Sequence, residues 1–324
     1  MRFILRRIGV SIPLLFGVSV LVFALVANAG DPLAQLRDQP DVSAQVIAIR
    51  RHELHLDEPV LARYGRWLTH FVRGDFGTSN SGQQVRTLLW QRMQVTLRMV
   101  LLATVISLVA GFAFGITGSV GQHSFFDQSS RLVSYLLVAA PSFFIAGLLQ
   151  EFGAVRLNRL VGHRVLYTVG EASPNLSGGL LHRLADYGGH LVLPTVALAV
   201  GPIVIWGRYL RSSMLEVLEA DYVRAARARG VPEGRILLLH AARNALIPLT
   251  TLVALDFAHV LAGSVIIERA FSWHGMGEML VDGVTNADPN VVLAWLMVTA
   301  TAVLAFNLLA DLAYGWLDPR IRVD

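Results

Sequence analysis

Six long stretches that are almost free of charged side chains recur along this chain of 324 residues. Each is close to the roughly 20 residues that cross a hydrocarbon core of about 30 Å as a helix. The pattern therefore predicts an all-α membrane protein with six transmembrane helices. The stretches are Ile8 to Ala29, Met99 to Gln122, Leu132 to Gln150, Leu191 to Gly207 with the kink-forming Pro194 and Pro202, Ala245 to Ile267 with Asp256 as its one charge, and Pro289 to Ala310.

The segment after the first stretch has a different, amphipathic pattern. Apolar residues recur there at helical spacing, first around Val46 and Ile49 and then from Leu61 to Phe71. This pattern predicts short helices at the membrane surface. We therefore divide the chain into residues 1–29 (amino terminus and first helix), 30–92 (an extracytoplasmic loop), 93–317 (a five-helix core with a cytoplasmic loop at 208–244) and 318–324 (a cytoplasmic tail).

The placement of arginine predicts the orientation. Arg2, Arg6 and Arg7 precede the first stretch, and residues 208–244 are also rich in arginine. The first stretch is long for a signal peptide and lacks a small-residue cleavage site, so we interpret it as a retained helix. The positive-inside rule then places both termini in the cytoplasm and makes the chain a multi-pass protein of the cytoplasmic (inner) membrane. Arginines at 30–92 oppose this orientation, but that loop is near the length of about 60 residues at which the rule loses force.

Composition excludes several classes of protein. Hydrophobic residues make up 54% of the chain and charged residues 15%, against about 25% charged in soluble domains. The sequence has neither cysteine nor lysine, which excludes thiolate chemistry and the lysine of a phosphate-binding Walker A loop. Without a catalytic or metal-binding motif, we expect a non-catalytic chain with no cofactor or metal of its own. The net charge of +4 indicates arginine at the membrane edges rather than nucleic-acid binding.

The cytoplasmic loop has the pattern of a surface helix. Residues Met214 to Arg229 are rich in good helix formers, and Gly230 followed by Pro232 predicts the end of that helix. Arg235 to Ala245 then resumes as a helix that leads into the membrane. Small side chains such as Ala225 suit a helix that a soluble partner grips. A surface helix whose arginines touch anionic lipid has the same pattern, so both interpretations remain open from these residues alone.

Several motifs follow one another in a distinctive order. They are R-R-I-G-V-S-I-P-L-L-F near the start, R-G-D-F-G-T-S at Arg73 to Ser79, A-P-S-F-F at Ala140 to Phe144, D-Y-V-R-A-A-R-A-R-G with its A-A-x-x-x-G core before R-N-A-L-I-P, and L-D-P-R-I-R-V at the end. Over nearly the whole chain they resemble the B-type permease subunits of ATP-binding-cassette (ABC) importers of the oligopeptide and dipeptide (peptide/nickel) family.

This resemblance implies a type I ABC importer permease fold with one long outer loop after the first helix. It also implies partners: a homologous C-type permease, two ATP-binding subunits or one fused ATPase, and an extracytoplasmic substrate-binding protein. ATP and Mg would be bound by the ATPase subunits. Arg224 stands where the general motif has glutamate, so a glutamate-specific contact is not carried over. The implied ATPase-coupling residues are Asp221, Tyr222, Arg224, Ala225, Ala226, Arg227, Ala228, Arg229 and Gly230.

Asp256 lies in the middle of the fifth stretch, where a carboxylate facing lipid costs about 2.5–3.5 kcal/mol on insertion scales. It must therefore face protein or water. His259 shares its helix face, and both residues are candidates for a translocation path. The resembling family more often has an uncharged amide at the position of Asp256. Three interpretations remain open: a cavity-lining group, a partner for the second permease, or a local hydrogen bond.

The turn after the fifth stretch is aromatic and rich in glycine. One interpretation is an interfacial aromatic anchor. The other, implied by the resemblance, is an outer contact with the binding protein. The residues concerned are Ser272, Trp273, His274, Gly275 and Met276.

The sequence therefore predicts the permease subunit of an ABC importer that translocates peptides across the membrane, in contact with membrane lipid. Nickel chelates and glutathione-like compounds are alternative cargoes of the same architecture. An ion-coupled secondary transporter centred on Asp256 is the main rival class, and a membrane anchor without transport is a third.

Overall fold

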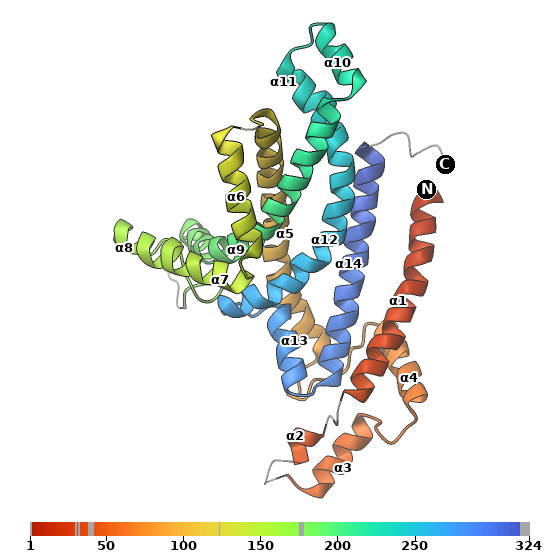
Figure 1. Ribbon diagram of the computed structural model, residues 1–324. Coiled ribbons are helices and arrows are strands. Elements are labelled where there is room, and N and C mark those ends of the chain that lie inside the picture. Colours follow the sequence, from red (N-terminus) through yellow and green to blue (C-terminus); the bar gives the residue numbers. More distant parts are fainter. Residues whose placement is uncertain are drawn as a thin grey trace. The chain divides into compact units, whose positions relative to one another are not determined.

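The computed structural model describes residues 2–29, 31, 33–37, 42–122, 124–174 and 178–317. The predicted tail at 318–324 lies outside them. The described residues form helices and loops with one isolated β-bridge, between Thr78 and Gln84 (Figure 1). The chain divides into two compact units, one of residues 1–95 and 274–305 and the other of residues 96–273 and 306–324.

Long apolar helices confirm the predicted fold class. Five helices are long and apolar enough to cross a membrane, and a bent helix pair makes six if it is one span. The fourth predicted stretch lies within a much longer helix, because polar residues at both of its ends continue the helical conformation. The candidate spans are Gly9–Asn28, Val85–Val120, Leu180–Leu218, Glu233–Ala270 and Pro289–Leu312, with Asp127–Ala139 and Ser142–Val161 as the bent pair.

The third span is not the straight helix that the sequence pattern predicted. Helix α6 (Phe125–Ala139) and helix α7 (Ser142–Leu148) meet at a bend of 111° between the two arms of the pair (Figure 1). Ala140 is extended at the bend, with ψ 129°. Pro141 explains this geometry, because proline has no N–H and disfavours the helical conformation of the residue before it. The motif A-P-S-F-F thus contains a helix break.

The first unit contains the predicted outer helices. After α1 (Arg2–Asn28) come α2 (Ala34–Arg37), α3 (Ala44–Glu53) and α4 (Val60–Val72). Ser43 caps α3 by accepting a hydrogen bond from the N–H of Val46. Aromatic rings connect α4 to α1, with Tyr64 at 5.4 Å and Trp67 at 5.5 Å from Phe23. The apolar side chains Tyr64 and Trp67 thus place one face of α4 on α1.

The second unit is built on α9 (Leu180–Leu218) and α12 (Ala242–Ala270), which pack along one another. Between α7 and α9 lie the π-helical η1 (Leu149–Arg156) and α8 (Leu157–Val161). The core of the unit is apolar, and helix α5 (Val85–Val120) approaches α9 closely. A Cβ atom on Gly115 would lie 2.8 Å from the Cβ of Leu210, so this approach requires glycine.

An ion pair joins α6 to α9. The Asp127 carboxylate accepts hydrogen bonds from Nε of Arg211 at 2.9 Å and from its Nη2 at 3.0 Å. Arg211 Nε also lies 3.2 Å from the carbonyl oxygen of Gly118 in α5. Asp127 is 1% exposed and Arg211 18%. Two parallel hydrogen bonds with so little water access make this a geometrically specific connection of three helices.

Candidate functional site

A short helix outside the candidate spans connects α9 to α12. Helix α10 (Asp221–Ala228) is followed by α11 (Glu233–Arg235) and the π-helical turn η2 (Ile236–Ala241). These elements extend beyond the ends of α9 and α12 (Figure 1). The helix predicted from Met214 to Arg229 is in fact two helices, because Ala220 is extended, with ψ 148°. Asp221 then begins α10, where an acidic side chain favours a helix amino terminus.

Three contacts brace α10 on the following helices. Val223 is fully buried, and the hydroxyl of Tyr222 accepts a hydrogen bond of 2.8 Å from the side-chain amide of Asn244 in α12. Arg227 Nη2 donates to Glu233 across 2.6 Å, and this hydrogen bond, with the attraction between the charges, raises the pKa of Arg227 above its usual value. Gly230, with φ +77°, makes the predicted left-handed turn.

The other face of α10 is open. Ala225 and Ala228 are exposed and Ala226 is half-buried. Arg224 is exposed and paired with Asp221 within the same helix. The predicted coupling residues up to Ala228 therefore lie together on one braced helix that presents small side chains between arginines, and Arg229 and Gly230 follow at its end.

The mid-span carboxylate has a partner that the sequence pattern did not identify. Asp256 Oδ2 accepts a hydrogen bond of 2.8 Å from the indole Nε1 of Trp206 in α9. Its other oxygen lies 3.5 Å from Nδ1 of His259. Trp206 is buried, at 1% exposed, whereas the His259 side chain is 84% exposed. The structure thus brings Asp256 and His259 together, and it turns the carboxylate towards the chain's own core.

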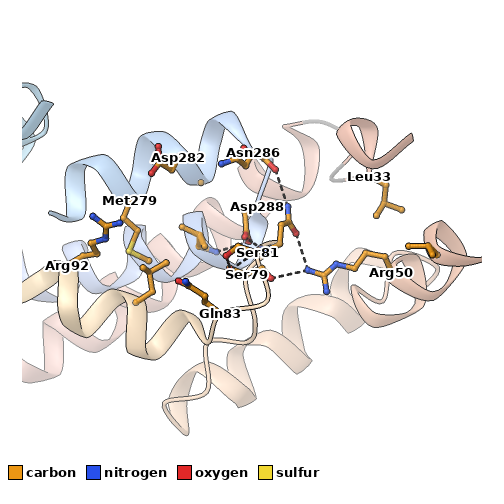
Figure 2. A pocket seen from close by; sticks show the side chains of 15 residues that line it. Leu33, Arg50, Ser79, Ser81, Gln83, Arg92, Met279, Asp282, Asn286 and Asp288 are labelled. Atoms are coloured by element: carbon orange, nitrogen blue, oxygen red, sulfur yellow. Dashed lines mark hydrogen bonds between the residues drawn. The ribbon is translucent and has the colours of Figure 1, made fainter. Parts of the chain in front are cut away.

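A cavity of about 700 Å³ opens in the first unit, between α3, the loop at 78–84 and α13 (Met276–Thr285). Figure 2 shows Arg50 reaching from α3 towards Ser79. Its guanidinium donates hydrogen bonds to the carbonyl of Ser79 and to the side-chain oxygen of Asn80. Arg50 also pairs with Glu53, and Arg92 pairs with Glu278 at 2.7 Å. Both arginines of this wall are therefore paired with carboxylates of the same unit. The polar residues of its lining are Arg50, Ser79, Asn80, Ser81, Gln83, Arg92, Asp282, Asn286 and Asp288.

Asp288 fixes the start of α14 (Pro289–Leu317) in this wall. Its carboxylate accepts hydrogen bonds from the N–H of Asn80 at 2.5 Å and of Val291 at 3.2 Å. The side-chain amide of Asn80 donates a hydrogen bond of 3.1 Å to the carbonyl of Asn286. Burial raises the pKa of Asp288, although the hydrogen bonds from the N–H groups of Asn80 and Val291 oppose the shift. The side chain is both a helix cap and the connection between two distant loops.

Replacing Asp288 with alanine is expected to destabilise the first unit by about 1–2 kcal/mol, because a helix cap and the acceptor for the Asn80 N–H are lost together. Amide hydrogen exchange of the loop at 77–84, compared between the variant and the unchanged protein, measures the effect. Exchange there should accelerate, while exchange in α10 stays the same. Equal exchange in both proteins at 77–84 would contradict the capping role.

The outer turn combines exposed and buried residues. Ser272 has φ +52°, and Trp273 is 1% exposed. His274 is 65% exposed and lies 2.7 Å from Glu278. Gly275 precedes α13, and Met276, its first residue, is buried. Of the residues predicted to contact a binding protein, the side chains of Ser272 and His274 are accessible.

Sequence reasoning missed two features of these sites. One is α13, whose glycines and short length suggested only a turn. The other is the Trp206 partner of Asp256. A signal existed for the cap of α14, since Asp288 precedes Pro289, and proline is favoured at the first position of a helix. No group of three or more metal-ligating side chains occurs within the described ranges.

Comparisons with known proteins identify the family. A family model described as binding-protein-dependent transport system inner membrane component matches residues 103–323, and the model of its N-terminal region matches residues 1–100. The chain is 41% identical to the oligopeptide transport system permease protein OppB of Mycobacterium tuberculosis, covering 99% of each. It is 34% identical to AppB of Bacillus subtilis, an oligopeptide transport system permease protein, and to the glutathione transport system permease protein GsiC of Salmonella typhimurium, again over 99% of each.

A solved structure of the MetNI methionine ABC transporter shares the fold. The match has a TM-score of 0.53 at 15% identity and covers 71% of this chain and 96% of the other. It agrees with the type I importer permease fold that the motifs implied. Together with the full-length relatives, these matches establish that the chain belongs to the inner membrane components of binding-protein-dependent transport systems, the permease subunits of ABC importers.

Proposed function

We propose that this chain forms half of the path by which an ABC importer carries peptides into the cytoplasm. The observation that carries the proposal is α10, a braced helix with an open face of small side chains, held between two long helices. Relatives named as oligopeptide permeases, at 41% and 34% identity over almost the whole chain, support peptide as the cargo.

The chain itself is non-catalytic in this proposal. ATP and Mg bind to two partner ATPase subunits or to one fused pair, and a C-type permease completes the path. A binding protein delivers the cargo from outside, and both termini lie in the cytoplasm. Because α10 connects α9 to α12, a movement of the ATPase at α10 is passed directly to both membrane helices.

The predicted site residues take three roles. Asp221, Tyr222 and Arg224 to Gly230 contact the ATPase, Asp256 and His259 belong to the path, and the outer turn at 272–276 faces the binding protein.

Uptake by the complete complex in proteoliposomes tests the function. Radiolabelled trialanine is expected to accumulate only when binding protein outside and ATP inside are both present. Accumulation without ATP that follows an imposed proton or sodium gradient would instead establish a secondary transporter.

The GsiC relative favours glutathione as a second cargo. Uptake of radiolabelled glutathione, measured in the same way as that of trialanine, distinguishes the two. ATP-dependent uptake of trialanine but not of glutathione supports the peptide assignment, and uptake of glutathione but not of trialanine overturns it.

The outer-turn proposal is tested at His274, because truncating the buried Trp273 would leave a cavity. His274→Ala is expected to weaken the productive contact with the binding protein and to lower uptake about threefold to tenfold, in the range of a moderate interface contact. ATP hydrolysis measured without binding protein should not change. An unchanged dependence of uptake on binding-protein concentration would exclude His274 from this contact.

A further inference from the structure

One face of α12 is left exposed by the residues that the structure describes. Its exposed positions recur every three or four residues, which places them in one stripe along the helix. The stripe consists of Asn244, Pro248, Thr251, Leu255, His259, Ala262, Ile266 and Arg269.

This stripe is polar at intervals and carries no carboxylate. Thr251, His259 and Arg269 provide hydroxyl, imidazole and guanidinium groups on it. A face turned to lipid would be apolar along its whole length. The stripe is therefore suited to a polar and partly anionic neighbour.

Asp256 lies beside the stripe but does not belong to it. Its carboxylate is 17% exposed and is held by the indole of buried Trp206 at 2.8 Å. Its second oxygen is 3.5 Å from Nδ1 of His259. The carboxylate is thus placed to orient the imidazole rather than to meet cargo.

The orientation leaves the second nitrogen of His259 available. Its Nε2 has no hydrogen-bond partner within the described ranges, and the side chain is 84% exposed at mid-span. With a proton on Nε2, the imidazole donates a hydrogen bond from that atom. Such a donor suits a carboxylate, because charge-assisted hydrogen bonds are the stronger ones.

We infer that His259 is a specificity-determining residue that binds the C-terminal carboxylate of a peptide in transit, and that Asp256 and Trp206 position its ring. This inference rests on the proposed function. It assigns cargo contact to His259 and a positioning role to Asp256, and it predicts a preference for peptides with a free carboxyl terminus.

The test compares uptake of trialanine and trialanine amide by the complete complex, with the same binding protein in every case. The ratio of the two rates is measured for the unchanged complex and for His259→Gln. His163→Gln, the same substitution at an exposed histidine in the loop after α8, is the matched control. Because the binding protein is constant, its own preference cancels when the ratios are compared.

His259→Gln is expected to lower the preference for trialanine about tenfold, equivalent to the loss of about 1.4 kcal/mol. His163→Gln should leave the ratio unchanged. Asp256→Asn should lower the ratio by a smaller factor at an unchanged yield of assembled complex, which a purely structural role would not produce.

The inference is overturned if His259→Gln has the same ratio of trialanine to trialanine amide uptake as the complex without substitutions. If that complex transports trialanine with ATP, the proposed function remains intact. Loss of the second permease from the purified His259→Gln complex would also overturn it, because His259 would then be a subunit contact. Absence of ATP-dependent trialanine uptake in the unchanged complex would instead refute the proposed function.

Discussion

Replacing Ala225 with tryptophan is expected to separate the ATPase from the permease and to abolish most uptake. Ala225 is exposed on α10, while the opposite side of this helix is anchored by buried Val223. A large ring therefore projects from the face of α10 at which we propose that the ATPase docks, without disturbing the packing of α10. Overpacking a fitted interface typically costs about 1–3 kcal/mol, which corresponds to roughly 5- to 150-fold weaker association.

The measurement is the amount of ATPase that co-purifies with the permease, together with ATP-dependent peptide uptake. Ala44→Trp, at an exposed alanine of α3, is the control for an added surface tryptophan and should have no effect on either quantity. Ala226 is half-buried, so its replacement would also strain α10 and is a less direct test. Normal ATPase recovery with Ala225→Trp would leave α10 as a lipid-surface helix and refute the docking assignment.

Asp127→Ala is expected to lower the free energy of unfolding by about 3–5 kcal/mol, because it strands the cation of a buried ion pair. Arg211 is only 18% exposed and loses its two hydrogen bonds to the carboxylate. Arg131, at 3.8 Å from Asp127 and 45% exposed, contributes much less because water screens it. The thermal unfolding temperature of the detergent-solubilised complex measures the change.

The double variant Asp127→Ala with Arg211→Met is the decisive control. Removing both charges leaves no buried unpaired ion, since Arg131 is exposed to water, and methionine keeps much of the apolar volume of the arginine stem. The double variant should therefore be markedly more stable than Asp127→Ala alone. If both variants unfold at the same temperature, the destabilisation comes from lost packing and the ion pair contributes little.

Local patterns determined much of this protein. Long charge-free stretches specify membrane helices, because a helix satisfies all the backbone hydrogen bonds of a segment within that segment. The amphipathic spacing at 61–71 predicted α4, and Gly230 predicted the turn after α10. Each of these features depends on residues close together in sequence.

Other local signals were present but were overridden or misinterpreted. Pro141 lies inside an apolar stretch, and its steric effect on Ala140 bends the span by 111°. Good helix formers surround Ala220, yet the helix is interrupted there. Helix propensity is a weak preference, and the packing of Val223 and the bond between Tyr222 and Asn244 hold α10 as a separate helix.

Only the tertiary structure could assign partners to the buried polar groups. That Asp256 needs a partner follows from its place in an apolar helix. That the partner is Trp206, 50 residues away, depends on how α9 packs against α12. The same holds for Asp127 with Arg211, 84 residues apart, and for Asn80 with Asp288, 208 apart. Sequence composition shows which polar groups must be satisfied, and helix packing decides which distant group satisfies each one.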